Sequence, residues 1–82
     1  MRWKTTVRIK HLFTDAEDHE GVQSTMNAIA DVLESEPLFT YFDAGVFRSI
    51  PQGDDVFGPA DYANKWLERM YDYADAHGIW ID

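Results

Sequence analysis

The sequence predicts a small α+β domain whose elements follow the order strand, helix, strand, strand, helix, strand. Three observations lead to this prediction. Residues 2–13 alternate between apolar and polar side chains, two longer stretches carry apolar residues at helical spacing, and two β-prone runs between them are joined by a short loop that contains glycine. With 82 residues, 45% of them apolar, we expect one domain that spans residues 1–82.

The alternation in residues 2–13 indicates a half-buried strand, because successive side chains of a strand point to opposite faces. One face would be basic, since it collects Arg2, Lys4, Thr6, Arg8 and Lys10. The opposite face would point into the core and collects Trp3, Thr5, Val7, Ile9, His11 and Phe13.

The next element is predicted to be a helix over residues 15–35. Thr14 and Glu17 have the spacing of a capping box, in which Thr14 is the N-cap and Glu17 the third helical residue. Apolar residues then recur at helical spacing and would form the buried face: Val22, Met26, Ile29 and Leu33. Pro37 disfavours helical geometry at Glu36 and so ends the helix.

A β-hairpin is predicted after this helix, over residues 38–42 and 46–50. Both runs are rich in β-branched and aromatic residues, and Gly45 closes the three-residue loop between them, where a hairpin needs positive φ. Residues 51–59 are expected to form a loop with its own turn chemistry.

The second helix is predicted to begin at Pro59 and to end at Gly78. Proline suits the first helical position, and glycine suits the position that follows a helix. Its inward face would hold Ala63, Trp66, Leu67, Met70, Ala74 and His77, and its polar face Asp61, Lys65, Glu68, Arg69 and Asp72. Residues 78–82 would form a short terminal strand.

This order of elements is typical of the ferredoxin-like βαββαβ fold, a four-stranded antiparallel sheet with two helices on one face. The core predicted from it holds Val7, Ile9, Val22, Met26, Ile29, Leu33, Trp66, Leu67 and Met70. A rival topology keeps both helices and the outer strands but leaves residues 38–58 as a long loop. We prefer the sheet, because so many aromatic residues are unusual in a loop of that length.

Charge is the most unusual feature of the composition. The net charge is −8, yet residues 1–13 carry +4 and residues 14–82 carry −12. The chain has no cysteine, so it has neither disulfides nor thiolate metal sites, and we expect a cytoplasmic protein. The sequence shows no apolar run that would span a membrane and no signal peptide, and no membrane association is expected.

No catalytic, metal or cofactor site is predicted. His11, Asp15, Asp18 and His19 are metal-ligating residue types, but capping explains the carboxylates, and His11 falls on the inward face of the strand. Asp54 and Asp55 are neighbours in a turn, where their side chains would point apart. His77 is interpreted as capping the second helix, whose dipole favours a cation there.

The predicted function is therefore that of a small non-enzymatic binding protein, an inhibitor or regulator that docks on the basic surface of a nucleic-acid-handling protein. The residues expected to contact this partner are the carboxylates Asp15, Glu17, Asp18, Glu20, Asp31, Glu34, Asp54 and Asp55, with Tyr62 and Tyr73 as anchors. In size and charge the chain is similar to phage-encoded inhibitors such as DNA mimics and anti-CRISPR proteins, although no motif links it to them.

Two alternatives stay open at this point. The chain could be a homo-oligomeric module, such as a homodimer, that uses its basic strand face to hold nucleic acid or protein. It could also be a small ferredoxin-like dimeric enzyme with His11 or His77 as its base. A basic sheet face is also used by RNA-recognition modules, but their aromatic signature is absent from this strand.

Overall fold

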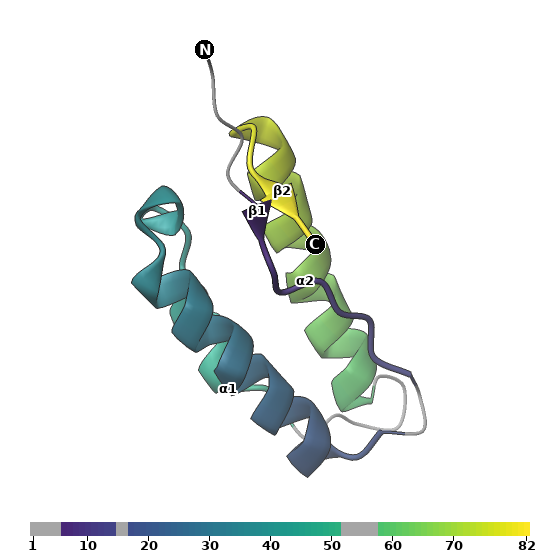
Figure 1. The fold of residues 1–82 in the computed structure, drawn as a ribbon. Helices are drawn as coiled ribbons and strands as arrows, with labels where there is room; N and C mark the ends of the chain where they lie inside the picture. The colour runs from purple at the N-terminus through teal and green to yellow at the C-terminus, as the bar shows by residue number, and fades with distance from the viewer. Residues whose placement is uncertain (1–5, 15–16, 52–57) are drawn as a thin grey trace.

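The computed structural model describes residues 6–14, 17–51 and 58–82. Two long α-helices dominate it: α1 (His19–Ser35) and α2 (Pro59–Ala76). They lie side by side, and the N-terminal segment runs along them (Figure 1). Two short 3-10 helices, η1 (Pro37–Phe39) and η2 (Ala44–Arg48), follow α1.

Only two short strands occur among the described residues, β1 (Thr6–Val7) and β2 (Trp80–Ile81). They pair in parallel, with Thr6 opposite Trp80 and Val7 opposite Ile81. The prediction of a ferredoxin-like α+β fold with a four-stranded antiparallel sheet is therefore wrong. The arrangement is closer to the rival topology, because both helices and short outer strands are present without a hairpin between them.

The N-terminal segment keeps the alternation of a strand beyond β1, and the Lys10 amide still donates to the Asp82 carbonyl, just after β2, at 3.0 Å. Val7, Ile9 and Phe13 are buried, whereas Arg8 and Lys10 are exposed. The backbone of residues 11 and 13 bonds to the side chains of Tyr71 and Asn64 on α2. The alternation thus predicts the burial of these side chains correctly but assigns their backbone to the wrong partner.

The predicted hairpin is replaced by η1 and η2. Pro37 occupies the first turn of η1, and the Asp43 side chain accepts a hydrogen bond from the Gly45 amide at 3.1 Å to cap η2. These local turns satisfy the backbone without a second strand. The segment still places Phe39, Phe47 and other apolar side chains in the core, which is why its composition resembles that of a buried hairpin.

The helix ends agree with the prediction at three of four positions. Helix α1 ends before Pro37, α2 begins at Pro59, and Gly78, with φ of +69°, follows the end of α2. The start of α1 is different, because its N-cap is Asp18, whose carboxylate accepts a hydrogen bond from the Gly21 amide at 2.8 Å. The Glu17 carboxylate does accept a bond from the Thr14 amide at 2.8 Å, but both residues precede the helix.

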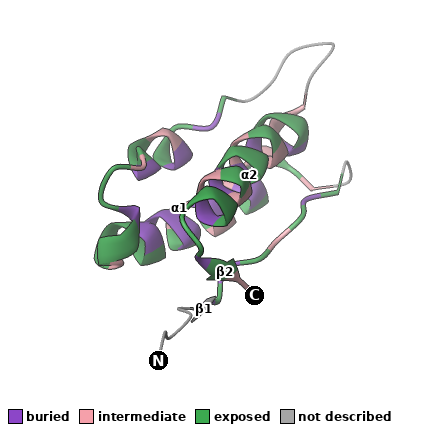
Figure 2. Ribbon diagram, turned by 90° about the horizontal axis from the view of Figure 1, so that it is seen from above, coloured by how far each residue is buried: buried purple, intermediate pink, exposed green. Residues whose placement is uncertain are grey.

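The core lies between α1, α2 and the two irregular segments, and buried residues line the facing sides of the helices (Figure 2). Of the nine residues predicted for it, eight are buried. The exception is Trp66, which is partly buried and has the guanidinium of Arg69 4.9 Å from its ring centroid. Neither described α-helix is both long and apolar enough to cross a membrane.

Candidate functional site

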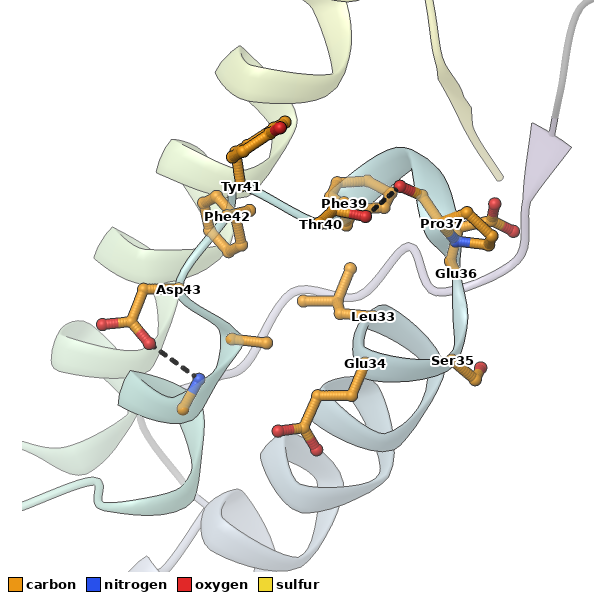
Figure 3. A pocket seen from close by; sticks show the side chains of 12 residues that line it. Leu33, Glu34, Ser35, Glu36, Pro37, Phe39, Thr40, Tyr41, Phe42 and Asp43 are labelled. Atoms are coloured by element: carbon orange, nitrogen blue, oxygen red, sulfur yellow. Dashed lines mark hydrogen bonds between the residues drawn. The ribbon is translucent and has the colours of Figure 1, made fainter.

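The α1-end pocket is an open hollow of about 770 Å³ where α1 gives way to η1 and η2 (Figure 3). Its wall comes from the last turn of α1 and from the segment that follows it in sequence. The residues that line it are Leu33, Glu34, Ser35, Glu36, Pro37, Phe39, Thr40, Tyr41, Phe42, Asp43, Ala44 and Gly45.

The shape of this pocket depends on a chain of local hydrogen bonds. Both the Thr40 amide and the Thr40 hydroxyl donate to the Pro37 carbonyl, at 3.2 and 2.5 Å, and the Phe42 amide donates to the Phe39 carbonyl at 2.9 Å. The bonds at Thr40 and at Asp43 are drawn as dashed lines in Figure 3. Every one of these bonds lies within a few residues of sequence, so the segment holds its own form once its aromatic side chains are anchored.

An aromatic cluster anchors the segment to α2. Phe39 stacks on Tyr73 with ring centroids 5.5 Å apart, Phe42 lies 5.3 Å from Tyr73, and Phe42 meets the edge of Phe47 at 5.9 Å. Tyr73 also stacks on His77 at 4.3 Å. Contacts of this kind fix the relative positions of the rings, and so they hold the pocket-lining residues Phe39 and Phe42 against α2.

The rim of the pocket carries negative charge. Glu34 is exposed, Glu36 is half-buried and Asp43 is exposed. The carboxyl end of a helix adds its own negative partial charge, and none of the residues in the last turn of α1, all of which the structure describes, is basic. The dipole of α1 therefore adds to the negative charge of Glu34, whereas the Glu36 and Asp43 carboxylates each accept a backbone amide hydrogen bond, from Leu38 and Gly45.

One cation partly offsets this charge. Arg48 of η2 forms ion pairs with Asp31, at 2.5 Å, and with Glu34. The hydrogen bonds that Arg48 donates to Glu34 and Asp31 raise the pKa of its guanidinium above its ordinary value. The pairs are solvent-exposed, so they tie η2 to α1 only weakly.

The most exposed aromatic side chain of the described residues is Tyr41, at the edge of the pocket, with 92% of its surface accessible. Leu38, in η1, is 43% exposed. An exposed tyrosine beside several carboxylates gives the pocket edge both an apolar contact area and a charge. Sequence reasoning missed both residues because it assigned them to a hairpin strand.

The acidic residues predicted to bind a partner do not form one surface. Asp15, Asp54 and Asp55 lie outside the described residues. Asp31 and Glu34 share Arg48, whereas Glu17, Asp18 and Glu20 lie at the other end of α1 from the pocket. Of the predicted carboxylates that the structure describes, only Glu34 lines the α1-end pocket.

The two predicted anchor tyrosines have different environments. Tyr62 is 36% exposed on α2 and remains available for contact. Tyr73 is half-buried in the aromatic cluster, and its hydroxyl lies 3.5 Å from the Leu38 carbonyl. It therefore packs behind the pocket-lining residues Phe39 and Phe42. Tyr41 is far more accessible than either of them. The spacing of Asp43 and Gly45, which matches a capping turn, was the signal that could have revealed the segment's true form.

The histidines considered as metal ligands or bases have separate surroundings. The His11 ring packs against Phe13 with centroids 4.4 Å apart, and its Nε2 atom is buried without a hydrogen-bond partner. His19 Nε2 lies 2.6 Å from the Ile50 carbonyl oxygen, and His77 caps α2 and stacks on Tyr73. Within residues 6–14, 17–51 and 58–82, no three metal-ligating side chains are grouped.

Residues 11–13 are held by two side chains of α2. The Tyr71 hydroxyl accepts a hydrogen bond from the His11 amide at 2.8 Å and lies 2.6 Å from the His11 carbonyl oxygen, to which it donates. The Asn64 amide group does the same for Phe13, accepting from its N–H and donating to its C=O, both at 3.0 Å. Two side chains of α2 thus make the backbone hydrogen bonds that a neighbouring strand would otherwise make.

Comparisons of the chain with the known protein families, with curated proteins and with solved structures found no match.

Proposed function

We propose that this protein is a small acidic binding protein whose α1-end pocket docks on the positively charged surface of a partner protein. The observation that carries the proposal is the combination, in the lining of one pocket, of the carboxylates of Glu34, Glu36 and Asp43 with the exposed Tyr41. This surface replaces the broader acidic face expected from the sequence.

Electrostatics supports a basic partner. The net charge of −8 attracts cations over long distances, and the three rim carboxylates concentrate that field at the negative end of α1. Such a field speeds the encounter with a basic surface and disfavours contact with the phosphates of nucleic acid. Arg48 provides an internal example of the chemistry, because its guanidinium already lies between two carboxylates of α1.

The side chains at the pocket favour a partner whose surface is rich in arginine or lysine. The exposed ring of Tyr41 offers a face on which a cationic side chain can stack, and Asp43 and Glu34 offer carboxylate oxygens nearby. Tyrosine is also one of the residue types that most often supply binding energy in protein interfaces. Tyr41 would therefore be the anchor, and the carboxylates would orient the partner.

The class of partner follows from the same chemistry. A protein surface that binds nucleic acid is rich in arginine and lysine that contact phosphates. A protein that covers such a surface with carboxylates would block the access of nucleic acid to it. We therefore propose a regulator or inhibitor of a nucleic-acid-handling protein as the biological role.

The experiment measures binding of a fluorescent arginine-rich peptide to the protein and to two matched pairs of variants. Tyr41→Ala removes the proposed anchor, whereas Tyr62→Ala removes an exposed tyrosine of α2 as its control. Asp43→Asn removes a rim charge but keeps an N-cap residue, and Asp72→Asn removes a charge of α2 in the same way. Tyr41→Ala and Asp43→Asn should each weaken binding several-fold, and the α2 variants should change it little.

Binding should also weaken as salt is added, because the attraction between exposed charges is screened. Equal losses in the two variants of each pair would show that the peptide responds to net charge alone, and would contradict a site at the α1-end pocket. Absence of any binding at low salt would overturn the proposed function as a whole.

A further inference from the structure

The solvent-facing side of α1 carries a stripe of small and apolar residues that is distinct from the α1-end pocket. Thr25, Ala28 and Val32 follow one another at helical spacing, Ala28 and Val32 are exposed, and Val32 keeps 38% of its surface accessible. Beyond the stripe, Leu12 of the N-terminal segment is 75% exposed. Apolar surface of this kind on an otherwise charged helix needs an explanation.

The two flanks of the stripe have opposite charge. On one side the N-terminal segment forms a shallow groove of about 190 Å³ with α1, lined by Arg8 and Lys10 as well as by Thr25, Ala28 and Val32. On the other side lies Asp31, whose carboxylate is 72% exposed despite its pair with Arg48. Each copy of the chain therefore presents a basic flank, an apolar stripe and an acidic flank in that order around α1.

This order decides how two copies could meet. A two-fold axis parallel to α1 places the helices side by side in the same direction, and it brings the basic flank of each copy to the acidic flank of the other. A two-fold axis perpendicular to the helices brings like-charged flanks together, which is unfavourable. An interface of the first kind uses the same patch on both copies and closes on itself.

We infer that the protein forms a parallel homodimer through α1, in which Arg8 and Lys10 of one copy meet Asp31 of the partner subunit. The small side chains of Thr25 and Ala28 allow the two helices to approach closely, and Val32 becomes covered. The opposed charges at both flanks make the interface self-complementary even though each copy carries a net charge of −8. This dimer leaves the residues of the α1-end pocket other than Glu34 and Ser35 away from the stripe, so it does not depend on the proposed function.

The first test exchanges charges between copies. A chain with Arg8→Glu and Lys10→Glu should be monomeric, because its acidic residues would meet Asp31 of the partner subunit, and a chain with Asp31→Lys should be monomeric for the opposite reason. When the two variant chains are mixed, both flanks become complementary again and a heterodimer should form. Sedimentation velocity measures all three samples, and circular dichroism checks that each variant chain is folded.

The second test is disulfide cross-linking, which leaves every charged residue of the chain in place. The natural chain has no cysteine, so Ser35→Cys introduces a single thiol near the end of α1, and Ser49→Cys introduces one on the exposed segment after η2 as a control. In the parallel dimer the two thiols introduced by Ser35→Cys lie close together and should form a disulfide under mild oxidation, whereas Ser49→Cys should not cross-link. A protein that remains monomeric at high concentration, or a mixture of charge variants that stays monomeric while both are folded, would overturn the inference.

Discussion

Two irregular segments flank the helices, and they satisfy their backbones in different ways. Residues 36–50 bond mainly to themselves through η1, η2 and their caps, assisted by the Gln23 side chain, which bonds to the Phe47 carbonyl and the Ile50 amide. Residues 11–13 bond instead to Asn64 and Tyr71, which are more than fifty residues away in sequence. Both segments bury apolar side chains, so burial alone does not reveal what pairs with a backbone.

This difference has a consequence for stability. The form of residues 36–50 should depend on the packing of their aromatic side chains, because the hydrogen bonds are local. The position of residues 11–13 should depend on two polar side chains of α2. Substitutions that remove one kind of interaction at a time can separate the two cases.

The largest effect is expected from Phe47→Ala. Phe47 is fully buried in η2 and contacts Phe42, so its truncation leaves a cavity in the core. Loss of a buried phenylalanine side chain costs about 3–5 kcal/mol of unfolding free energy, which chemical denaturation can measure. A change below about 1 kcal/mol would show that η2 does not pack against α1 as described.

A smaller effect is expected from Tyr71→Phe, which keeps the ring but removes the hydroxyl that bonds to both backbone groups of His11. Leaving such groups unpaired costs about 1–3 kcal/mol. Tyr73→Phe is the matched control, because the Tyr73 hydroxyl makes one long bond of 3.5 Å. Denaturation midpoints that fall equally for both variants would contradict a special role for Tyr71.

Asn64→Ala should destabilise the protein to a lesser degree than Tyr71→Phe. It too unpairs both backbone groups of one residue, Phe13, but alanine has a better helix propensity than asparagine, which returns roughly 0.5 kcal/mol within α2. Thermal melting of the two single variants and of the double variant would show whether the losses add. Full additivity would mean that the two side chains hold residues 11–13 independently.

The smallest effect is expected from Arg48→Gln. The guanidinium is solvent-exposed and pairs with two exposed carboxylates, so solvent and salt screen the interaction. The melting temperature should change little, and the difference from the unmodified protein should vanish at high salt. A large loss would indicate that the pairs with Asp31 and Glu34 hold η2 in place more strongly than its aromatic contacts.

Much of the helical framework can be predicted from the sequence, because its signals are local. Pro37, Pro59 and Gly78 mark helix ends, and the spacing of Val22, Met26, Ile29 and Leu33 identifies the buried face of α1. The predicted start of α1 is misplaced because Thr14 and Asp18 both offer plausible caps, and the bond between Glu17 and Thr14 forms without a helix.

The parts that could not be predicted depend on partners that lie far away in sequence. Alternation identifies the buried side chains of residues 7–13, but no pattern in the sequence indicates that Asn64 and Tyr71 would replace a neighbouring strand. The aromatic residues from 38 to 50 fit a hairpin as well as they fit 3-10 helices packed on α2. The α1-end pocket arises from the second of these arrangements, so the predicted hairpin did not identify Tyr41, Glu36 and Asp43 as a site.

Side chains of α2, rather than a strand, hold the backbone of residues 11–13. Amide hydrogen exchange measured by NMR tests it most directly, in the unmodified protein and in Tyr71→Phe. The amides of His11 and Phe13 should both be protected in the unmodified protein, and Tyr71→Phe should greatly speed exchange at His11 while Phe13 keeps its bond to Asn64. Unchanged protection of the His11 amide in a folded Tyr71→Phe variant would show that the Tyr71 hydroxyl does not hold this backbone.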